Sequence, residues 1–245
     1  MTAQMLELED GRRLAYHRAP GAGPGVVFLG GFRSDMTGTK AQFLEDWARR
    51  AGRACLRFDY TGHGASSGDF ADGCIGDWLS DAADALTRLS AGPQILVGSS
   101  MGGWIALLLA RRFPARVAGL VGIAAAPDFT EDSMWPALSP AARARLMAEG
   151  RVAVESAYAS DGYVITRRLI EDGRRHLVLR DPLPLPFPVR LLHGTADEDV
   201  EVAVALRLLA HADCPDMRLT LVKDADHRLS GPAELALIAR TLEEI

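Results

Sequence analysis

A serine flanked by glycines carries the clearest chemical signal in this sequence. Residues 98–102 read Gly-Ser-Ser-Met-Gly, a G-x-S-x-G motif centred on Ser100, between an apolar run at residues 94–97 and a helix-like stretch at residues 104–113. A strand that stops, turns sharply and starts a helix holds its middle residue in a strained conformation at the top of a sheet. Glycines on both sides give that turn room. We therefore take Ser100 as the candidate nucleophile.

Two later segments supply a base and an acid. An apolar run at residues 188–192 is followed by His-Gly-Thr-Ala-Asp, whose last residue is Asp197. A second apolar run, at residues 217–222, leads into a loop that contains His227. Parallel strands flanked by helices bring such exit loops to one edge of a sheet, where Ser100 also sits. A serine hydroxyl needs an imidazole to take its proton and a carboxylate to orient that imidazole. We expect His227 to be the base and Asp197 its partner.

The choice of acid has competitors in the same loops. These carboxylates could equally be solvated or cap backbone N–H groups: Glu198, Asp199, Asp224 and Asp226. Asp197 is preferred because it closes the His-Gly-x-x-Asp pattern at a strand exit, with Asp199 as the alternative.

Acyl transfer also needs donors for the oxyanion of its tetrahedral intermediate. The first is the backbone N–H of Met101, directly after the nucleophile. The second should come from the loop after the strand at residues 25–29, where two glycines precede Phe32, and we assign it to the Phe32 N–H. The alternative interpretation is that Gly30 and Gly31 form only a turn with positive φ.

The remaining histidines do not form a metal site by their spacing. His193, at a strand end, is expected to be a buried structural residue, and His63, in the loop after residues 54–58, is expected to border the site. His17, His176 and His211 have no acidic or cysteine partners at metal-ligand spacing. We therefore predict neither a metal nor a cofactor.

The elements that must position these residues alternate along the chain. After a hairpin at residues 5–8 and 14–17, predicted strands near residues 26, 55, 95, 119, 190 and 219 interleave with predicted helices near residues 45, 82, 107, 205 and 238. This alternation is typical of an α/β protein with a doubly wound, mostly parallel sheet and helices on both faces. At 245 residues the chain suits one such domain, residues 1–245.

The alternation is interrupted at residues 128–184, which we interpret as an inserted cap. This segment predicts a helix at residues 140–149, a strand pair at residues 152–165 and a helix at residues 167–174. A proline-rich stretch at residues 181–188 reads as a stiff linker back to the core, with a partner-binding motif as the alternative. Large apolar side chains in the cap could form its own core or face the serine: Met134, Trp135, Leu138, Leu146, Met147, Tyr163 and Ile165.

These motifs together make the chain similar to the α/β-hydrolase family of serine hydrolases. Within it, the chain resembles the subfamily of mitochondrial palmitoyl-protein thioesterases that also cleave acyl glucuronides. The segments that carry this resemblance are residues 31–41, 55–62, 92–104, 190–194 and 226–228. The resemblance implies a Ser-His-Asp triad and an acyl-enzyme intermediate. The chain departs from it at residues 199–201, which lack a common proline, and matches poorly over residues 128–184, so it leaves substrate choice open.

Composition excludes several other classes of function. The net charge is −5, from 27 basic and 32 acidic residues, which argues against a nucleic-acid partner. The longest apolar run, residues 104–110, is too short to span a membrane, and residues 1–10 lack the pattern of a signal peptide. Three cysteines without motif spacing favour reduced thiols. From these features we expect a cytoplasmic location.

The sequence therefore predicts a cofactor-independent serine esterase or thioesterase that acts on hydrophobic acyl groups. Its expected partner is a small-molecule acyl ester or thioester, with acylated proteins as a further substrate class. Two alternatives stay open at this stage. The same triad could hydrolyse carbon–carbon bonds or act as a perhydrolase, or the fold could serve as a non-catalytic ligand-binding protein. The sequence makes no prediction of oligomeric state.

Overall fold

The central strands carry apolar side chains on both faces, and each face is covered by helices. In β3 (Ala22–Leu29), Val26 and Phe28 pack into one layer, whereas Val27 and Leu29 pack into the other. The first layer contains α1 (Thr39–Arg50) and α8 (Pro232–Glu243), and the second contains α2 (Ile75–Leu89), α3 (Met101–Arg112) and α7 (Val202–His211). The computed structural model describes residues 3–156 and 159–245. Strands buried on both faces are typical of parallel sheets between helical layers.

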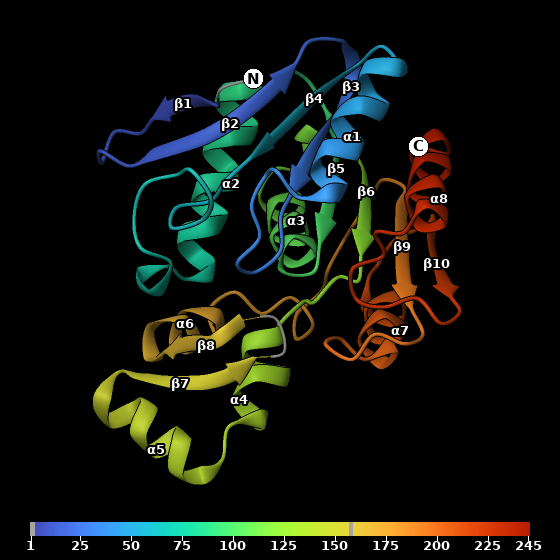
Figure 1. Cartoon of the computed structure of the whole chain (residues 1–245). Helices are drawn as coiled ribbons and strands as arrows, with labels where there is room; N and C mark the ends of the chain where they lie inside the picture. The colour runs from blue at the N-terminus through green and yellow to red at the C-terminus, as the bar shows by residue number, and fades with distance from the viewer. Residues whose placement is uncertain (1–2, 157–158) are drawn as a thin grey trace.

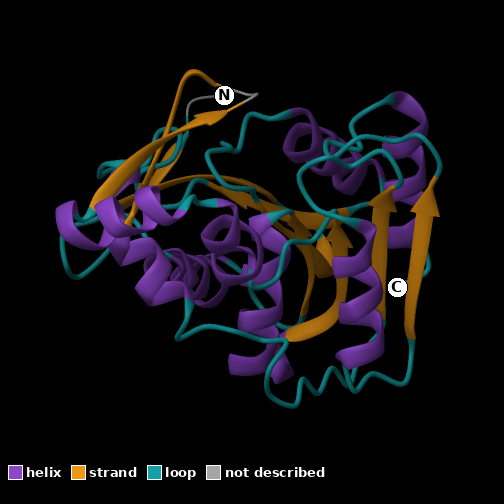
Figure 2. Ribbon diagram, turned by 90° about the horizontal axis from the view of Figure 1, so that it is seen from below, coloured by secondary structure: helices purple, strands orange, loops and turns teal. Residues whose placement is uncertain are grey.

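Eight of the described strands form one large sheet, shown in Figures 1 and 2. Its strand order is β1 (Gln4–Glu7), β2 (Arg13–Ala19), β4 (Arg53–Phe58), β3, β5 (Gln94–Ser99), β6 (Val117–Ile123), β9 (Val189–Gly194) and β10 (Met217–Val222). The first two strands form an antiparallel hairpin, β2 is antiparallel to β4, and the other pairs are parallel. The predicted α/β fold, with its mostly parallel sheet, is confirmed. The exit loops of β3, β5, β6, β9 and β10 share one edge.

Between β6 and β9 the chain forms a separate small layer, coloured yellow-green to gold in Figure 1. It contains a π-helical turn (Thr130–Met134), α4 (Trp135–Ala137), α5 (Pro140–Glu149), the antiparallel strands β7 (Arg151–Ser156) and β8 (Ala159–Thr166), and α6 (Arg167–Gly173). The side chain of Ser139 caps α5 by accepting from the Ala142 N–H, and Gly150 ends this helix at φ 81°. Residues 157 and 158, inside the predicted strand pair, lie outside the described residues.

This inserted segment has its own apolar core. That core contains Leu138, Leu146, Val152, Ile165 and Ile170, with Met134, Trp135 and Tyr163 packed against it. Met147, by contrast, is 38% exposed. Residues 181–188 then return the chain to β9 in extended form, with Leu183, Leu185 and Phe187 buried and Pro184 in a single bridge with Asp213. No helix among the described residues is long and apolar enough to cross a bilayer.

Candidate active site

Ser100 stands at the turn from β5 into α3 in a conformation that non-glycine residues rarely adopt. Its φ is 54° and its ψ is −119°. The flanking glycines are required by close backbone approach: a Cβ at Gly98 would lie 2.3 Å from the Gly102 oxygen, and one at Gly102 would lie 2.0 Å from the Leu29 oxygen. No side chain fits at either position. The turn therefore presents the Ser100 hydroxyl at the sheet edge, at the cost of local backbone strain.

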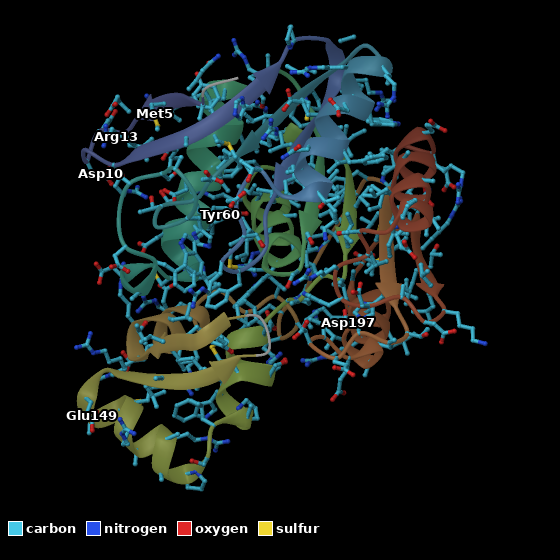
Figure 3. The ribbon with its side chains drawn as sticks, in the orientation of Figure 1. Met5, Asp10, Arg13, Tyr60, Glu149 and Asp197 are labelled. Carbon is cyan, nitrogen blue, oxygen red and sulfur yellow. The ribbon has the colours of Figure 1, made fainter. Side chains whose placement is uncertain are left out.

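The structure brings Ser100, His227 and Asp197 into one line of hydrogen bonds. Ser100 Oγ lies 3.1 Å from His227 Nε2, and His227 Nδ1 lies 2.8 Å from Asp197 Oδ2 and 3.1 Å from Oδ1. His227 comes from the loop after β10, and Asp197 comes from the loop after β9, where Figure 3 labels it. Because an ionised carboxylate only accepts hydrogen bonds, the proton sits on Nδ1. Nε2 is then free to accept the serine proton.

Asp197 is held as a charged acceptor. Its side chain is fully buried, which disfavours the charge. The hydrogen bond from His227 and those from the N–H groups of Val200 and Asp199, both 2.9 Å from Oδ1, outweigh that cost and lower the pKa of Asp197 below 3.8. The carboxylate is thus ionised at neutral pH and can stabilise an imidazolium beside it.

The competing carboxylates occupy other positions. Asp199 is exposed and contributes its backbone N–H to Asp197. Asp226 caps the N–H groups of Arg228 and Leu229 at 3.0 and 3.2 Å. Ligand atoms of Asp197, Asp199 and His227 lie within 4.8 Å of one another, a spacing that could hold a metal ion. However, Asp197 and His227 already bond to each other there, so a cation would have to break the pair that orients the imidazole.

Both candidate oxyanion donors come from backbone segments close to Ser100. Gly31, directly before Phe32, approaches so closely that a Cβ on it would lie 3.4 Å from Ser100 Cβ. Met101 is the first residue of α3, so its N–H precedes the first hydrogen bond within that helix. Among the described residues no backbone or side-chain acceptor engages the Phe32 N–H. The N–H groups of Phe32 and Met101 therefore remain the candidate donors for an oxyanion formed at Ser100.

An aromatic cluster surrounds Phe32. Its ring meets Phe70, Trp78, Phe129 and Tyr163 edge to face, with centroids 4.8 to 5.9 Å apart. Tyr163 belongs to β8, so the inserted segment reaches the loop of a candidate oxyanion donor. Phe70, Trp78 and Phe129 could not be predicted as neighbours of the site, because they come from separate elements and share no sequence spacing.

His193, expected to be a structural residue, and His63, expected to border the site, are both buried. His193 Nε2 lies 2.8 Å from the Val200 oxygen, consistent with a structural role in the loop of Asp197. His63 lies between two loops, with Nδ1 3.2 Å from the Thr61 oxygen and Nε2 3.2 Å from the Arg33 nitrogen. It thus borders the candidate oxyanion loop.

A cavity of about 430 Å³ opens next to the triad. It lies between the loop after β6 and the segment from the β9 exit loop into α7. Its walls include Ala126, Phe129, Leu179, Asp199, Val200 and Val204. The Ala126 N–H donates to the Ser100 backbone oxygen at 3.1 Å. One residue in the cavity wall is therefore in direct contact with Ser100. The walls combine apolar residues with charged ones, mostly acidic but including Arg207.

The sequence and the fold of this chain are similar to those of known proteins. A sequence model of the alpha/beta hydrolase fold matches residues 26–162. The rat protein named palmitoyl-protein thioesterase ABHD10, mitochondrial, is 36% identical over 245 residues, which cover the whole of this chain and 82% of that protein. A crystal structure of a protein from Agrobacterium vitis S4 superposes with a TM-score of 0.94 at 41% identity, covering 99% of this chain and 97% of that one. Mouse alpha/beta hydrolase domain-containing protein 10 gives a TM-score of 0.92 at 35% identity, over 100% and 98%.

One expectation from the sequence is wrong. The names of the rat, mouse, orangutan, human and bovine relatives all carry the word mitochondrial, which contradicts the expected cytoplasmic location. That expectation was based on the predicted reduced state of the three cysteines and on the lack of a signal-peptide pattern in residues 1–10. Reduced cysteines are compatible with more than one reducing compartment. The lack of a secretory signal pattern in ten residues does not exclude other targeting signals.

Proposed function

The chain belongs to the α/β-hydrolase family and is a hydrolase of the esterase or thioesterase type, and we propose that Ser100, His227 and Asp197 are its catalytic triad. One observation carries the proposal: the hydrogen-bonded line from Ser100 Oγ through His227 to Asp197, with contacts of 3.1 and 2.8 Å. The strained backbone of Ser100 supports it further, because such strain concentrates at functional residues.

In the acylation step, Ser100 Oγ attacks the carbonyl carbon of the acyl substrate while His227 Nε2 takes the hydroxyl proton. The carbonyl π electrons move to the oxygen, which the N–H groups of Phe32 and Met101 stabilise. When the intermediate collapses, the bond to the leaving group breaks, and the imidazolium protonates that group if it needs a proton. Asp197 stabilises the imidazolium throughout and is itself not protonated. The product is an ester on Ser100.

Deacylation repeats these steps with water. His227 Nε2 removes a proton from a water molecule, whose oxygen attacks the acyl carbon of the Ser100 ester. The same two N–H groups receive the oxyanion. Collapse of the second intermediate breaks the bond to Ser100 Oγ, which recovers its proton from the imidazolium. A carboxylic acid leaves and the triad returns to its starting state.

We assign the substrate class as thioesters and esters of hydrophobic acyl groups, carried by small molecules or by acylated proteins. The rings of Phe32, Phe129 and Tyr163, which meet at the candidate oxyanion loop, favour an apolar acyl group over a sugar or a peptide. The rat relative's name, a palmitoyl-protein thioesterase, supports the thioester.

The test compares acyl-CoA thioesters and p-nitrophenyl esters of graded chain length on wild type, Ser100→Ala and Ser99→Ala. Ser99→Ala is the matched control, since it makes the same change one residue away. We expect turnover of both substrate types by wild type and by the control, and a loss of at least about a thousand-fold in Ser100→Ala. Activity retained by Ser100→Ala would contradict the triad. Absence of turnover in wild type, with tight binding of acyl ligands, would instead favour a non-catalytic binding protein.

A further inference from the structure

The loop of the candidate oxyanion donor contains a turn that its own residues disfavour. The Ser34 N–H donates to the Gly31 oxygen at 3.1 Å, which closes a four-residue turn with Phe32 and Arg33 at its centre. Arg33 has a φ of 60°, whereas Phe32 is not among the residues with positive φ. Positive φ at the third position alone defines a type II turn, where glycine is favoured. An arginine there costs about 1 to 2 kcal/mol, so something outside the turn must hold it.

His63 supplies that external contact. Its Nε2 accepts the Arg33 N–H at 3.2 Å, and its Nδ1 faces the Thr61 oxygen, also at 3.2 Å. A carbonyl oxygen can only accept, so Nδ1 carries the proton and Nε2 keeps its lone pair for Arg33. His63 is 3% exposed, so this bond is shielded from bulk solvent. The histidine thus joins the exit loop of β4 to the exit loop of β3.

The ring of His63 is fixed on several sides. It packs edge to face against Tyr60, Phe70 and Trp78, with centroids 5.0 to 5.6 Å apart, and Tyr60 is labelled in Figure 3. Trp78 Nε1 also donates to the Thr61 oxygen at 3.1 Å. Burial, aided by the Arg33 charge, lowers the pKa of His63 to about 4, so the ring is neutral at neutral pH.

A second contact fixes the far end of the same loop. The buried carboxylate of Asp59 accepts the Met36 N–H at 2.6 Å and the Ala65 N–H at 2.8 Å. The loop is therefore attached to the β4 exit loop at Met36 and at Arg33. Between the Arg33 contact and the end of β3 lie only two glycines and Phe32, and the second glycine, Gly31, lies against Ser100: a Cβ on it would be 3.4 Å from Ser100 Cβ.

We propose that His63 is a positioning residue of the oxyanion hole: by accepting the Arg33 N–H, it holds the turn at residues 31–34 in its type II form and so fixes the Phe32 N–H beside Ser100. This inference rests on the proposed function. In a type I turn the Phe32–Arg33 peptide is rotated by about 180°, and Arg33 returns to the negative φ it prefers. Without the acceptor the turn relaxes in that direction and displaces Phe32. A shift of about 1 Å in a catalytic group can cost on the order of a hundred-fold in rate.

The first test distinguishes the hydrogen bond that His63 Nε2 accepts from the packing of the His63 ring. His63→Phe keeps an aromatic ring among Tyr60, Phe70 and Trp78 but removes the acceptor, whereas His63→Gln restores an acceptor and a donor. We expect His63→Phe to lower kcat by about ten- to a hundred-fold with KM within about three-fold, and His63→Gln to recover most of the loss. The inhibition constant of an acyl trifluoromethyl ketone, whose adduct places an oxyanion in the same site, should rise by the factor that kcat/KM falls. His211→Phe, which changes a histidine of α7, should match wild type.

The second test uses the strain in the turn. Arg33→Gly provides a residue that favours the type II turn without help, so the double variant His63→Phe/Arg33→Gly should recover at least about ten-fold in kcat over His63→Phe. A merely structural role for His63 predicts the opposite, because a glycine would loosen the loop further. The proposal is overturned if His63→Phe keeps wild-type kcat, if its loss appears in KM, or if Arg33→Gly gives no rescue.

Parallel measurement of Ser100→Ala keeps the two proposals distinguishable. If Ser100→Ala is inactive and His63→Phe equals wild type, the inference about His63 fails alone. If Ser100→Ala keeps activity, both the proposed function and this inference are contradicted.

Discussion

His227 Nδ1 lies 2.8 Å from a carboxylate oxygen of Asp197, whose side chain is completely buried. The pair fixes both the tautomer and the direction of the imidazole, because the donor on Nδ1 can only point at Asp197. The opposite nitrogen, Nε2, is thereby aimed at Ser100 Oγ, 3.1 Å away.

The role of the acid predicts a difference between two neighbouring carboxylates. Asp197→Asn keeps the shape but offers an amide N–H to Nδ1, which favours the wrong tautomer, so kcat should fall by about a thousand- to ten-thousand-fold. Asp199→Asn should stay within about five-fold of wild type, because Asp199 donates its backbone N–H to Asp197 and the substitution keeps that N–H. Steady-state kinetics on one thioester decide between them. The reverse ranking would transfer the catalytic acid to Asp199.

The proposed chemistry predicts a dependence on the leaving group. A thiolate departs with little help, whereas an alkoxide needs a proton from His227 as it leaves. For one acyl group, kcat/KM should therefore decrease from the thioester and the phenyl ester to the ethyl ester. The measurement uses acyl donors that differ only in this group. A rate that does not depend on leaving-group basicity would mean that departure is not part of the rate-limiting chemistry and would count against this mechanism.

Tyr163 predicts where acyl-chain preference resides. Its ring lies 5.9 Å from that of Phe32 and belongs to the inserted segment. Tyr163→Ala should shift the optimum acyl length or bulk upward by removing apolar contact and freeing space, while Tyr163→Phe should keep the wild-type profile. Met147→Ala, at an exposed position of α5, is the control. An unchanged profile in Tyr163→Ala would assign the acyl pocket to the core sheet and its helices.

Lys40 predicts a pH dependence of stability. Burial lowers its pKa to about 8, opposed by Asp226, and its Nζ donates to the Arg228 oxygen next to His227. Since an unfolded lysine titrates near 10.5, the unfolded chain binds more protons between pH 8 and 10.5, and the free energy of unfolding rises over this interval. Urea unfolding of wild type minus that of Lys40→Met should increase by on the order of 1 to 3 kcal/mol from pH 8 to 10.5. A difference that does not vary with pH would disprove the shifted titration.

The features that could be predicted are specified by residues close together in the sequence. A continuous apolar run such as Val26 to Leu29 indicates a strand buried on both faces, and a serine cap with a closing glycine delimits the helix Pro140–Glu149. The G-x-S-x-G turn and the two strand-exit loops identified Ser100, Asp197 and His227, which the structure brings together.

What the sequence could not provide depends on contacts between distant residues. The bond from Arg33 to His63 joins positions thirty residues apart, and the positive φ of Arg33 has no residue-type signal because arginine is not favoured there. The aromatic cluster around Phe32 gathers rings from four separate segments. The π-helical turn Thr130–Met134 was likewise not foreseen, since no composition distinguishes it from an ordinary helical turn.

The most direct test of the central claim is the position of the acyl group during turnover. A slowly hydrolysed acyl donor is mixed with the enzyme, the reaction is quenched in acid, and the intact protein and its peptides are weighed by mass spectrometry. We predict a mass increase of one acyl group on the peptide that contains Ser100, absent in Ser100→Ala and present in Ser99→Ala. An acyl group on a cysteine such as Cys214, or turnover without any acylated protein, would contradict a serine acyl-enzyme.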